Sequence, residues 1–217
     1  MAVTTFLTPC TMSVVGISGA GKTSLVRRLL RYRDVMFDSH FTSITYFYTI
    51  WQSVYGEMEE EFGTLIRFIE GLPGEGDVKQ IGETEGHKCI ILDDLMAAVS
   101  NNARMEDLFS RESHHYSISV LYISQNAFRQ GKSSRSIALN VHYTILMSNP
   151  RVSQVMTLGH QFGIGKALKE AFLDATSKKR FSYLILLASP RDASGFSMIT
   201  HVFPDETEPI TVYEPLF

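Results

Sequence analysis

The sequence has little cysteine, a single tryptophan and no long apolar run. Its two cysteines, Cys10 and Cys89, lie far apart in the 217 residues and indicate no disulfide framework, which fits a reducing compartment. No segment approaches the ~18 apolar residues of a membrane-spanning helix, and the N-terminus lacks the basic and apolar regions of a secretory signal. We therefore expect an intracellular protein that has no membrane partner.

Positive charge is not in excess either. The net charge is −3, with 44% hydrophobic and 20% charged residues, which is the balance of a soluble globular protein. This argues against a surface coated with positive charge that grips nucleic acid, although a basic patch on one face remains compatible with it. The length suits one domain. We expect a single domain over residues 1–217, with a core at about 12–203 and an acidic tail at 204–217 ordered only by a neighbour.

Strand-like and helix-like patterns alternate along the chain, which predicts an α/β fold with a mainly parallel sheet flanked by helices. Short apolar runs predict strands at residues 12–17, 43–48, 65–69, 89–92, 118–124 and 142–147. Helical periodicity predicts helices at residues 23–32, 51–62, 105–112 and 154–176, the last broken around 163–165. A C-terminal β-hairpin is expected from residues 183–188 and 198–203, with Pro190 in its turn. The glycine-rich stretch 71–87 predicts a surface loop.

A phosphate-binding motif follows the first predicted strand. Residues 16–23 read GISGAGKT and match G-x-x-x-x-G-K-[ST] in full. Glycines let the backbone approach phosphates and adopt positive φ, and the N–H groups of the loop and the next helix face the negative charge. Lys22 is expected to reach the β- and γ-phosphates of ATP, and the Thr23 hydroxyl to bind Mg²⁺. The alternative is a glycine-rich turn that only starts a helix. The expected nucleotide-binding residues are Gly16, Ile17, Ser18, Gly19, Ala20, Gly21, Lys22, Thr23 and Ser24.

An acidic pair closes a second buried strand. Residues 89–94 read CIILDD, and the carboxyl ends of parallel strands meet at one edge of a sheet. Asp93 is expected to hold Mg²⁺, mostly through water, and Asp94 to polarise the attacking water as a general base. Asp94 could instead cap the following helix, and the two roles are compatible.

Polar residues also end the strand predicted at 118–124. Gln125 is the first candidate to sense the γ-phosphate and Asn126 the second, the alternative being an ordinary polar loop. The basic loop after them, residues 128–135, reads FRQGKSSR. In a ring, an arginine of such a loop can reach the γ-phosphate of a neighbouring subunit. Arg135 is the first candidate for this catalytic finger and Arg151 the second, against the alternative of solvated charges.

The order of the strands along the chain favours one class of P-loop NTPase. The acid-bearing strand is separated from the first strand by the strand predicted at residues 43–48, whereas the two are adjacent in simple nucleotide kinases. We therefore expect the additional-strand type, with residues 43–48 as the inserted strand.

Several short segments occur together in one order: the phosphate loop, FIEGLP, ILDDLM, SHH, ISQN, NPR and DATSK. In this the chain resembles the DNA-packaging ATPases of Polinton/Maverick elements and adintoviruses, relatives of the poxvirus-type packaging ATPase in the FtsK–HerA superfamily. The resemblance covers about residues 13–203. It departs from the family in having Ile17 where relatives often have proline, and in its short basic loop.

The resemblance implies a homo-oligomeric ring that uses ATP to pump double-stranded DNA into a capsid, with a capsid or portal protein as partner. It also implies Gln125 as sensor and Arg135 as finger. DNA contacts could come from the arginines of residues 27–33 or from the basic residues 178–180, although a solvated face explains either cluster. The alternative functions are a nucleoside or nucleotide kinase, and a nucleotide-dependent assembly protein with weak hydrolysis. Trp51 is expected in the core or an interface rather than as a base-stacking platform.

Overall fold

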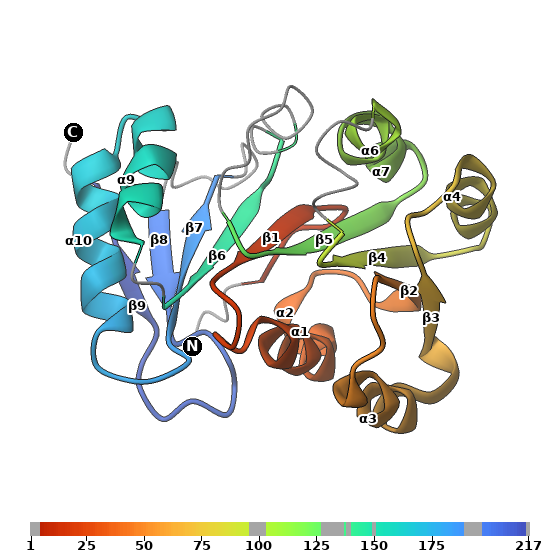
Figure 1. Cartoon of the computed structure of the whole chain (residues 1–217), viewed down its shortest axis with the longest axis horizontal. Helices are drawn as coiled ribbons and strands as arrows, with labels where there is room; N and C mark the ends of the chain where they lie inside the picture. The colour runs from red at the N-terminus through yellow and green to blue at the C-terminus, as the bar shows by residue number, and fades with distance from the viewer. Residues whose placement is uncertain are drawn as a thin grey trace.

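The computed structural model describes residues 5–95, 103–126, 137, 140–148, 151–188 and 197–215. Within these residues, nine strands form one sheet in the order β3-β2-β4-β5-β1-β6-β7-β8-β9 (Figure 1). The strands are β1 (Thr11–Val15), β2 (Phe41–Tyr48), β3 (Ile66–Glu70), β4 (His87–Asp93), β5 (Ile118–Ser124), β6 (Tyr143–Met147), β7 (Tyr183–Leu187), β8 (Ser197–Thr200) and β9 (Thr211–Tyr213).

The first six strands pair in parallel, and β6 to β9 pair antiparallel. All residues of β1, β5 and β6 are buried. Such continuous apolar runs are expected of strands covered on both faces. Neighbouring residues of β4 point to opposite faces, so Ile90 and Ile91 belong to different core clusters.

Helices cover both faces of the sheet (Figure 1). One face packs against α1 (Lys22–Arg31) and α3 (Ser53–Phe62), whose buried side chains join β1, β4 and β5 in the largest core cluster. The opposite face packs against α4 (Glu75–Gly82) and η2 (Leu108–Glu112) near β4 and β5, and against α9 (Val152–Gln161) and α10 (Gly165–Thr176) near β6 and β7. The short elements between them are α2 (Arg33–Met36), η1 (Gly63–Leu65), α6 (Ala103–Asp107) and α7 (Ser113–His115).

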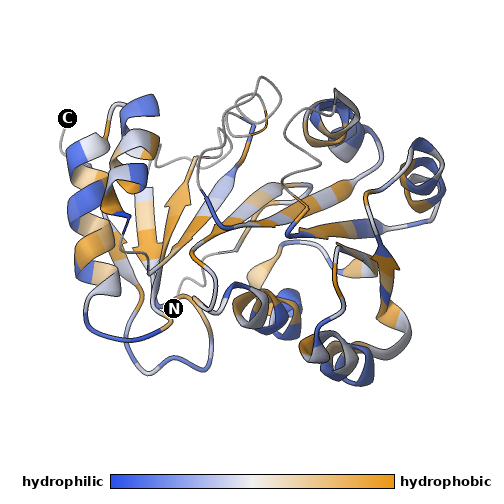
Figure 2. Cartoon of the chain, viewed as in Figure 1, coloured by the Kyte–Doolittle hydropathy of each residue, from blue (hydrophilic) through white to orange (hydrophobic). Residues whose placement is uncertain are grey.

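The apolar spacing of α1 explains how it docks. Leu25, Val26, Leu29 and Leu30 recur on one side of the helix and are buried, while the other side is polar (Figure 2). This packing fixes the first turn of α1 at the carboxyl end of β1. No helix in the described part of the chain is long and apolar enough to cross a membrane.

Most predicted elements are confirmed within a few residues, but the prediction of a loop at 71–87 was wrong. Helix α4 occupies its centre, with Val78 and Ile81 buried one turn apart. Its first turn is capped by a hydrogen bond from the Gly74 N–H to Asp77 Oδ2 at 2.8 Å. The glycines therefore flank a short amphipathic helix or lie in its first and last turns, where they do not interrupt it.

The C-terminal end also differs from the expectation. Strands β7 and β8 pair antiparallel as predicted, although the turn with Pro190 lies outside the described residues. The tail, however, contributes a strand of its own, because β9 pairs with β8 at the edge of the sheet. The expected hairpin is thus part of an antiparallel run from β6 to β9.

The strand between the two site-bearing strands is not the one predicted. Strand β5 pairs with β1 on one side and with β4 on the other. Strand β2, predicted as the inserted strand, pairs with β4 and β3 instead. Strand β4 is separated from β1 as expected, but by a strand that follows it in sequence.

Candidate functional site: a phosphate pocket

The loop between β1 and α1 is shaped by its glycines. Gly19 and Gly21 adopt left-handed φ angles of 75° and 89°, which cost a residue with a Cβ atom more than glycine. A Cβ on Gly16 would lie 2.7 Å from the Cβ of Met147, so a glycine is needed for the loop to pack this closely against β6. The loop then ends at α1, where the first N–H groups of a helix have no intrahelical partner.

Lys22 folds back over this loop. Its Nζ donates a hydrogen bond to the Ile17 carbonyl oxygen at 2.9 Å. Burial lowers the pKa of Lys22, whereas the nearby charges of Asp93 and Asp94 raise it. The ammonium therefore lies above the loop with acidic groups across the pocket.

Asp93 ends β4 and is 4% exposed. Its Oδ2 accepts hydrogen bonds from Tyr46 OH at 2.7 Å, from Tyr55 OH at 2.9 Å and from Thr23 Oγ1 at 3.3 Å. Tyr46 comes from β2, Tyr55 from α3 and Thr23 from α1, so three elements position one carboxylate. Gln52 Nε2 donates in turn to Tyr55 OH at 2.9 Å.

Burial sets the ionisation of this group. It raises the pKa of Asp93, although the hydrogen bonds from Tyr46, Tyr55 and Thr23 oppose the shift. Burial, together with the Asp93 charge, also raises the pKa of both tyrosines. The two hydroxyls consequently remain protonated near neutral pH and serve as donors.

Asp94 differs from its neighbour in exposure and in backbone conformation. It is exposed and has a φ of 54°, in the left-handed region that aspartate tolerates better than most residues. Its Oδ1 accepts a hydrogen bond from Gln125 Nε2 at 3.4 Å, and its carbonyl oxygen accepts one from Thr49 Oγ1 at 3.4 Å. The helix that Asp94 was alternatively predicted to cap would fall in residues outside those described.

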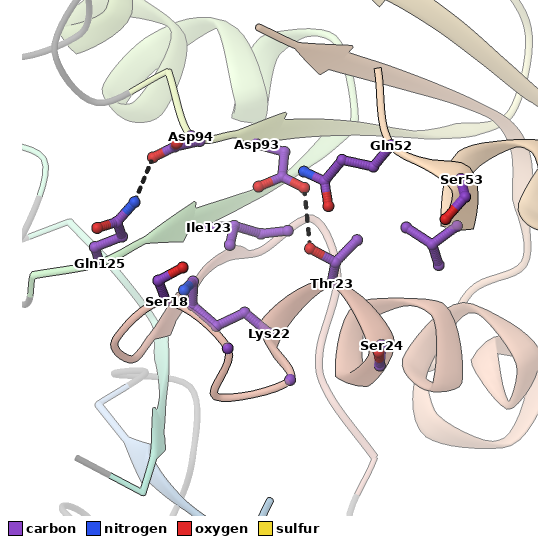
Figure 3. A pocket seen from close by; sticks show the side chains of 13 residues that line it. Ser18, Lys22, Thr23, Ser24, Gln52, Ser53, Asp93, Asp94, Ile123 and Gln125 are labelled. Atoms are coloured by element: carbon purple, nitrogen blue, oxygen red, sulfur yellow. Dashed lines mark hydrogen bonds between the residues drawn. The ribbon is translucent and has the colours of Figure 1, made fainter. Parts of the chain in front are cut away.

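These groups line one open pocket of about 360 Å³ (Figure 3). Most of the predicted nucleotide-binding residues lie on it. Its lining comprises Ser18, Gly19, Gly21, Lys22, Thr23, Ser24, Gln52, Ser53, Val54, Asp93, Asp94, Ile123 and Gln125. Gly16, Ile17 and Ala20 belong to the same loop but do not line the pocket, and the Ala20 N–H donates to the Ile17 carbonyl at 3.2 Å.

Residues 52–54 also line the pocket, although the sequence motifs did not predict them. They form the N-cap and the first residues of α3, which follows the carboxyl end of β2 after a short connection. The change from the apolar strand to a polar Gln-Ser pair was the available signal, because β2 ends at the same edge of the sheet as β1 and β4.

Asn126 and Arg151, the second candidates for sensor and finger, are not among the residues that line the pocket. Asn126 Oδ1 accepts hydrogen bonds from Arg151 Nη1 at 3.0 Å and from Gln154 Nε2 at 3.3 Å, which turns it toward α9. Arg151 thus lies against the second sensor candidate. Arg135 and the basic loop around it lie outside the described residues.

Most residues of the basic clusters considered for DNA contact are ion-paired within the chain, whereas Arg180 lies over the ring of Phe181. Arg27 and Arg31 on α1 pair with Glu61 of α3, and Arg27 also with Glu57. The remaining pairs are Arg28 with Asp205 and Glu206, Arg33 with Asp34, Lys178 with Asp174 and Lys179 with Glu208. This pattern favours the interpretation of the arginines of residues 27–33, and of Lys178 and Lys179, as solvated charges matched by acids of the same chain.

The pocket combines the groups that bind a polyphosphate with a divalent cation. Lys22 and the loop N–H groups suit the anion. The Thr23 hydroxyl and Asp93 carboxylate, 3.3 Å apart, are hard oxygen donors that fit Mg²⁺, which takes one or two protein ligands besides water and phosphate. Among the described residues, no group of three or more His, Cys, Asp or Glu side chains is arranged to hold a metal ion.

Comparison with known proteins shows the fold alone. The sequence matches no protein-family model and no curated protein. Two structures of the genome-packaging NTPase B204 align with 96% of this chain and 98% of theirs, at a TM-score of 0.59. One is from Sulfolobus turreted icosahedral virus 2 in complex with AMP, at 9% identity, and the other from Sulfolobus turreted icosahedral virus, at 10%. The cytoplasmic domain of the Thermomonospora curvata type VII secretion ATPase EccC aligns with 96% of this chain and 25% of its own, at 13% identity and a TM-score of 0.57.

Proposed function

We propose that this chain is an ATP-hydrolysing motor that moves double-stranded DNA into a viral capsid. The observation that carries the hydrolase part is the convergence of Lys22, Thr23, Asp93, Asp94 and Gln125 on one pocket. Support for the motor part comes from the shared fold with proteins described as a genome-packaging NTPase, one of them solved with ATP-γS.

Each side chain has a role that follows from its position. Lys22 holds the β- and γ-phosphates against the loop. Thr23 and Asp93 would hold Mg²⁺, which when bound neutralises charge on the phosphate oxygens. The exposed Asp94 accepts a proton from water as the water oxygen bonds to the γ-phosphorus. The bond from that phosphorus to the bridging oxygen then breaks and releases ADP. Gln125 reports the γ-phosphate, since its amide already contacts Asp94.

The same proposal includes the class of P-loop NTPase, the family and the assembly that the chain forms. The position of β5 between β1 and β4 supports the additional-strand type. With the sequence resemblance, it supports a member of the FtsK–HerA superfamily near the packaging ATPases of Polinton/Maverick elements and adintoviruses. We further propose a single-domain chain that forms a homo-oligomeric ring inside the host cell. Its ring would receive Arg135, or failing that Arg151, from a neighbouring subunit and would dock on a capsid or portal protein.

The test is ATP hydrolysis with and without long duplex DNA, at several salt concentrations, for the wild type and two variants. We expect DNA to stimulate the wild type, and Lys22→Ala and Asp94→Asn both to lose hydrolysis, the latter by about 10²- to 10⁴-fold with ATP binding retained. Normal hydrolysis by Lys22→Ala would overturn the catalytic assignment.

The same assay separates the alternatives. Rates that are independent of DNA at every salt concentration would overturn the motor and leave the ATPase. Phosphate transfer to a nucleoside or nucleotide acceptor would indicate a kinase. ATP binding and oligomerisation without turnover would indicate an assembly protein.

A further inference from the structure

A second cavity opens beside the phosphate pocket, on the other side of the start of α1. It has a volume of about 190 Å³ and is lined by Gly21, Ser24, Leu25, Arg28, Met147 and Phe181. Gly21 and Ser24 also line the phosphate pocket, so the two cavities are contiguous at these residues. The phosphate pocket is rich in charged and polar groups, whereas this cavity has an aliphatic, a thioether and an aromatic side chain in its wall.

Phe181 is unusual in two ways. It has a φ of 64°, although non-glycine residues in the left-handed region are uncommon, and it is 51% exposed. The ring nevertheless has a defined place, because a Cβ on Gly21 would lie 2.9 Å from its Cδ1. The guanidinium of Arg180 lies 4.8 Å from the ring centroid. An aromatic ring is thus held against the phosphate loop by a sparsely populated backbone conformation, which is a reason to look for function.

We propose that this cavity binds the base of the nucleotide and that the base stacks on Phe181. The inference rests on the proposed function, since it assumes a nucleoside triphosphate in the phosphate pocket. The base lies one ribose away from the α-phosphate, and must therefore occupy a space that adjoins the phosphate site. This cavity adjoins it at Ser24, and its apolar wall suits the faces of a planar heterocycle. Met147 supplies an adaptable contact from β6.

The exposed Trp51 is the competing platform and is less well placed. It is 47% exposed and makes edge contacts with Tyr48, Tyr55 and Phe68. It precedes Gln52, which Figure 3 shows beside Asp93, at the carboxylate side of the pocket. A base there would lie where the terminal phosphate and its cation are expected.

The test compares two ligands that differ only in the nucleoside. Binding of ATP and of inorganic tripolyphosphate, each with Mg²⁺, is measured by calorimetry for the wild type, Phe181→Ala, Phe181→Trp and Trp51→Ala. We expect Phe181→Ala to weaken ATP binding by about tenfold and to leave tripolyphosphate within about twofold, because stacking on an aromatic ring is removed. Phe181→Trp should retain ATP affinity, and Trp51→Ala should leave both ligands within about twofold.

The outcomes distinguish the two proposals. If Phe181→Ala weakens both ligands equally, or leaves ATP binding unchanged, the base site is overturned and the phosphate site stands. If Trp51→Ala selectively weakens ATP, the base lies on the carboxylate side and the proposal is again overturned. A wild-type protein that binds neither ligand would overturn the proposed function and the base site together. Circular dichroism melting of each variant excludes unfolding as the cause, and the exposure of both rings makes either substitution a mild perturbation.

Discussion

Basic side chains at the start of α1 and on its outer side differ in whether they are paired with acids. At its first turn, Lys22 donates a hydrogen bond to a backbone carbonyl and takes part in none of the ion pairs found among the described residues. On the outer side, Arg27, Arg28 and Arg31 each pair with acids from α3 or the tail. The difference teaches that a basic residue without an ion pair in its own chain is a better candidate for anion binding than one that is already paired. By that criterion Lys22 is the stronger candidate for contact with an anion, and the arginines of the outer face are the weaker ones.

The strongest way to test this contrast is to remove one cation from each side. Lys22→Ala should reduce ATP hydrolysis by about 100-fold or more, because a preorganised charge on the phosphates is lost. Arg31→Ala, from the same helix, should leave the rate within about twofold, because its partner Glu61 keeps Arg27. Steady-state phosphate release checks both. A comparable loss in Arg31→Ala would mean that the outer face also belongs to the working site.

The buried carboxylate of the pocket should also make the stability of the protein depend on pH. Because burial raises the pKa of Asp93, its contribution to stability is fully present below its ordinary pKa and is lost as pH rises through the higher folded value. Without nucleotide or Mg²⁺, the melting temperature of Asp93→Asn minus that of the wild type should therefore increase with pH over that window. A tenfold difference in proton affinity between the folded and unfolded states corresponds to about 1.4 kcal/mol in the free energy of unfolding.

Two further measurements sharpen this prediction. Tyr46→Phe removes one of the three hydrogen bonds to the Asp93 carboxylate. The loss of stability as pH rises should therefore be larger in this variant than in the wild type. Adding Mg²⁺ with ATP should narrow the difference between Asp93→Asn and the wild type, because a cation compensates the buried charge. A difference that is constant across pH would show that Asp93 does not titrate as its burial implies.

The sequence was informative where local patterns determine structure. The apolar runs located β1, β4 and β5, and the glycine-lysine motif located the loop and Lys22. It was less informative where tertiary contacts decide. Pairing of β5 between β1 and β4 is a non-local arrangement, and its position along the chain suggested β2 instead. The tail looked unpartnered because it is acidic and bears prolines, and because β9, which pairs with β8, has only three residues.

The site shows the same division. Asp93 could be named from its place after a buried strand, but the two tyrosines that hold it come from β2 and α3. Nothing in the local sequence of Tyr46 or Tyr55 distinguishes them from core aromatics. Likewise, Phe181 precedes β7 by two residues, and only folding brings it to Gly21. Residues that act through a partner elsewhere in the chain have no local signal.

The smallest expected effect lies on the outer face, where the tail's acids match α1. Asp205→Asn removes one of the two acidic partners of Arg28 and should lower the free energy of unfolding by roughly 0.2–1 kcal/mol, because partly exposed ion pairs contribute little. The loss should shrink as salt is added, since screening weakens the same attraction in the wild type. Glu214→Gln changes the net charge equally in the same tail and controls for long-range charge effects. Urea melts at low and high salt measure both variants. A loss of several kcal/mol, insensitive to salt, would mean that the tail's carboxylate is a structural anchor for α1, and the division of this helix into a ligand-binding turn and a self-matched outer face would fail.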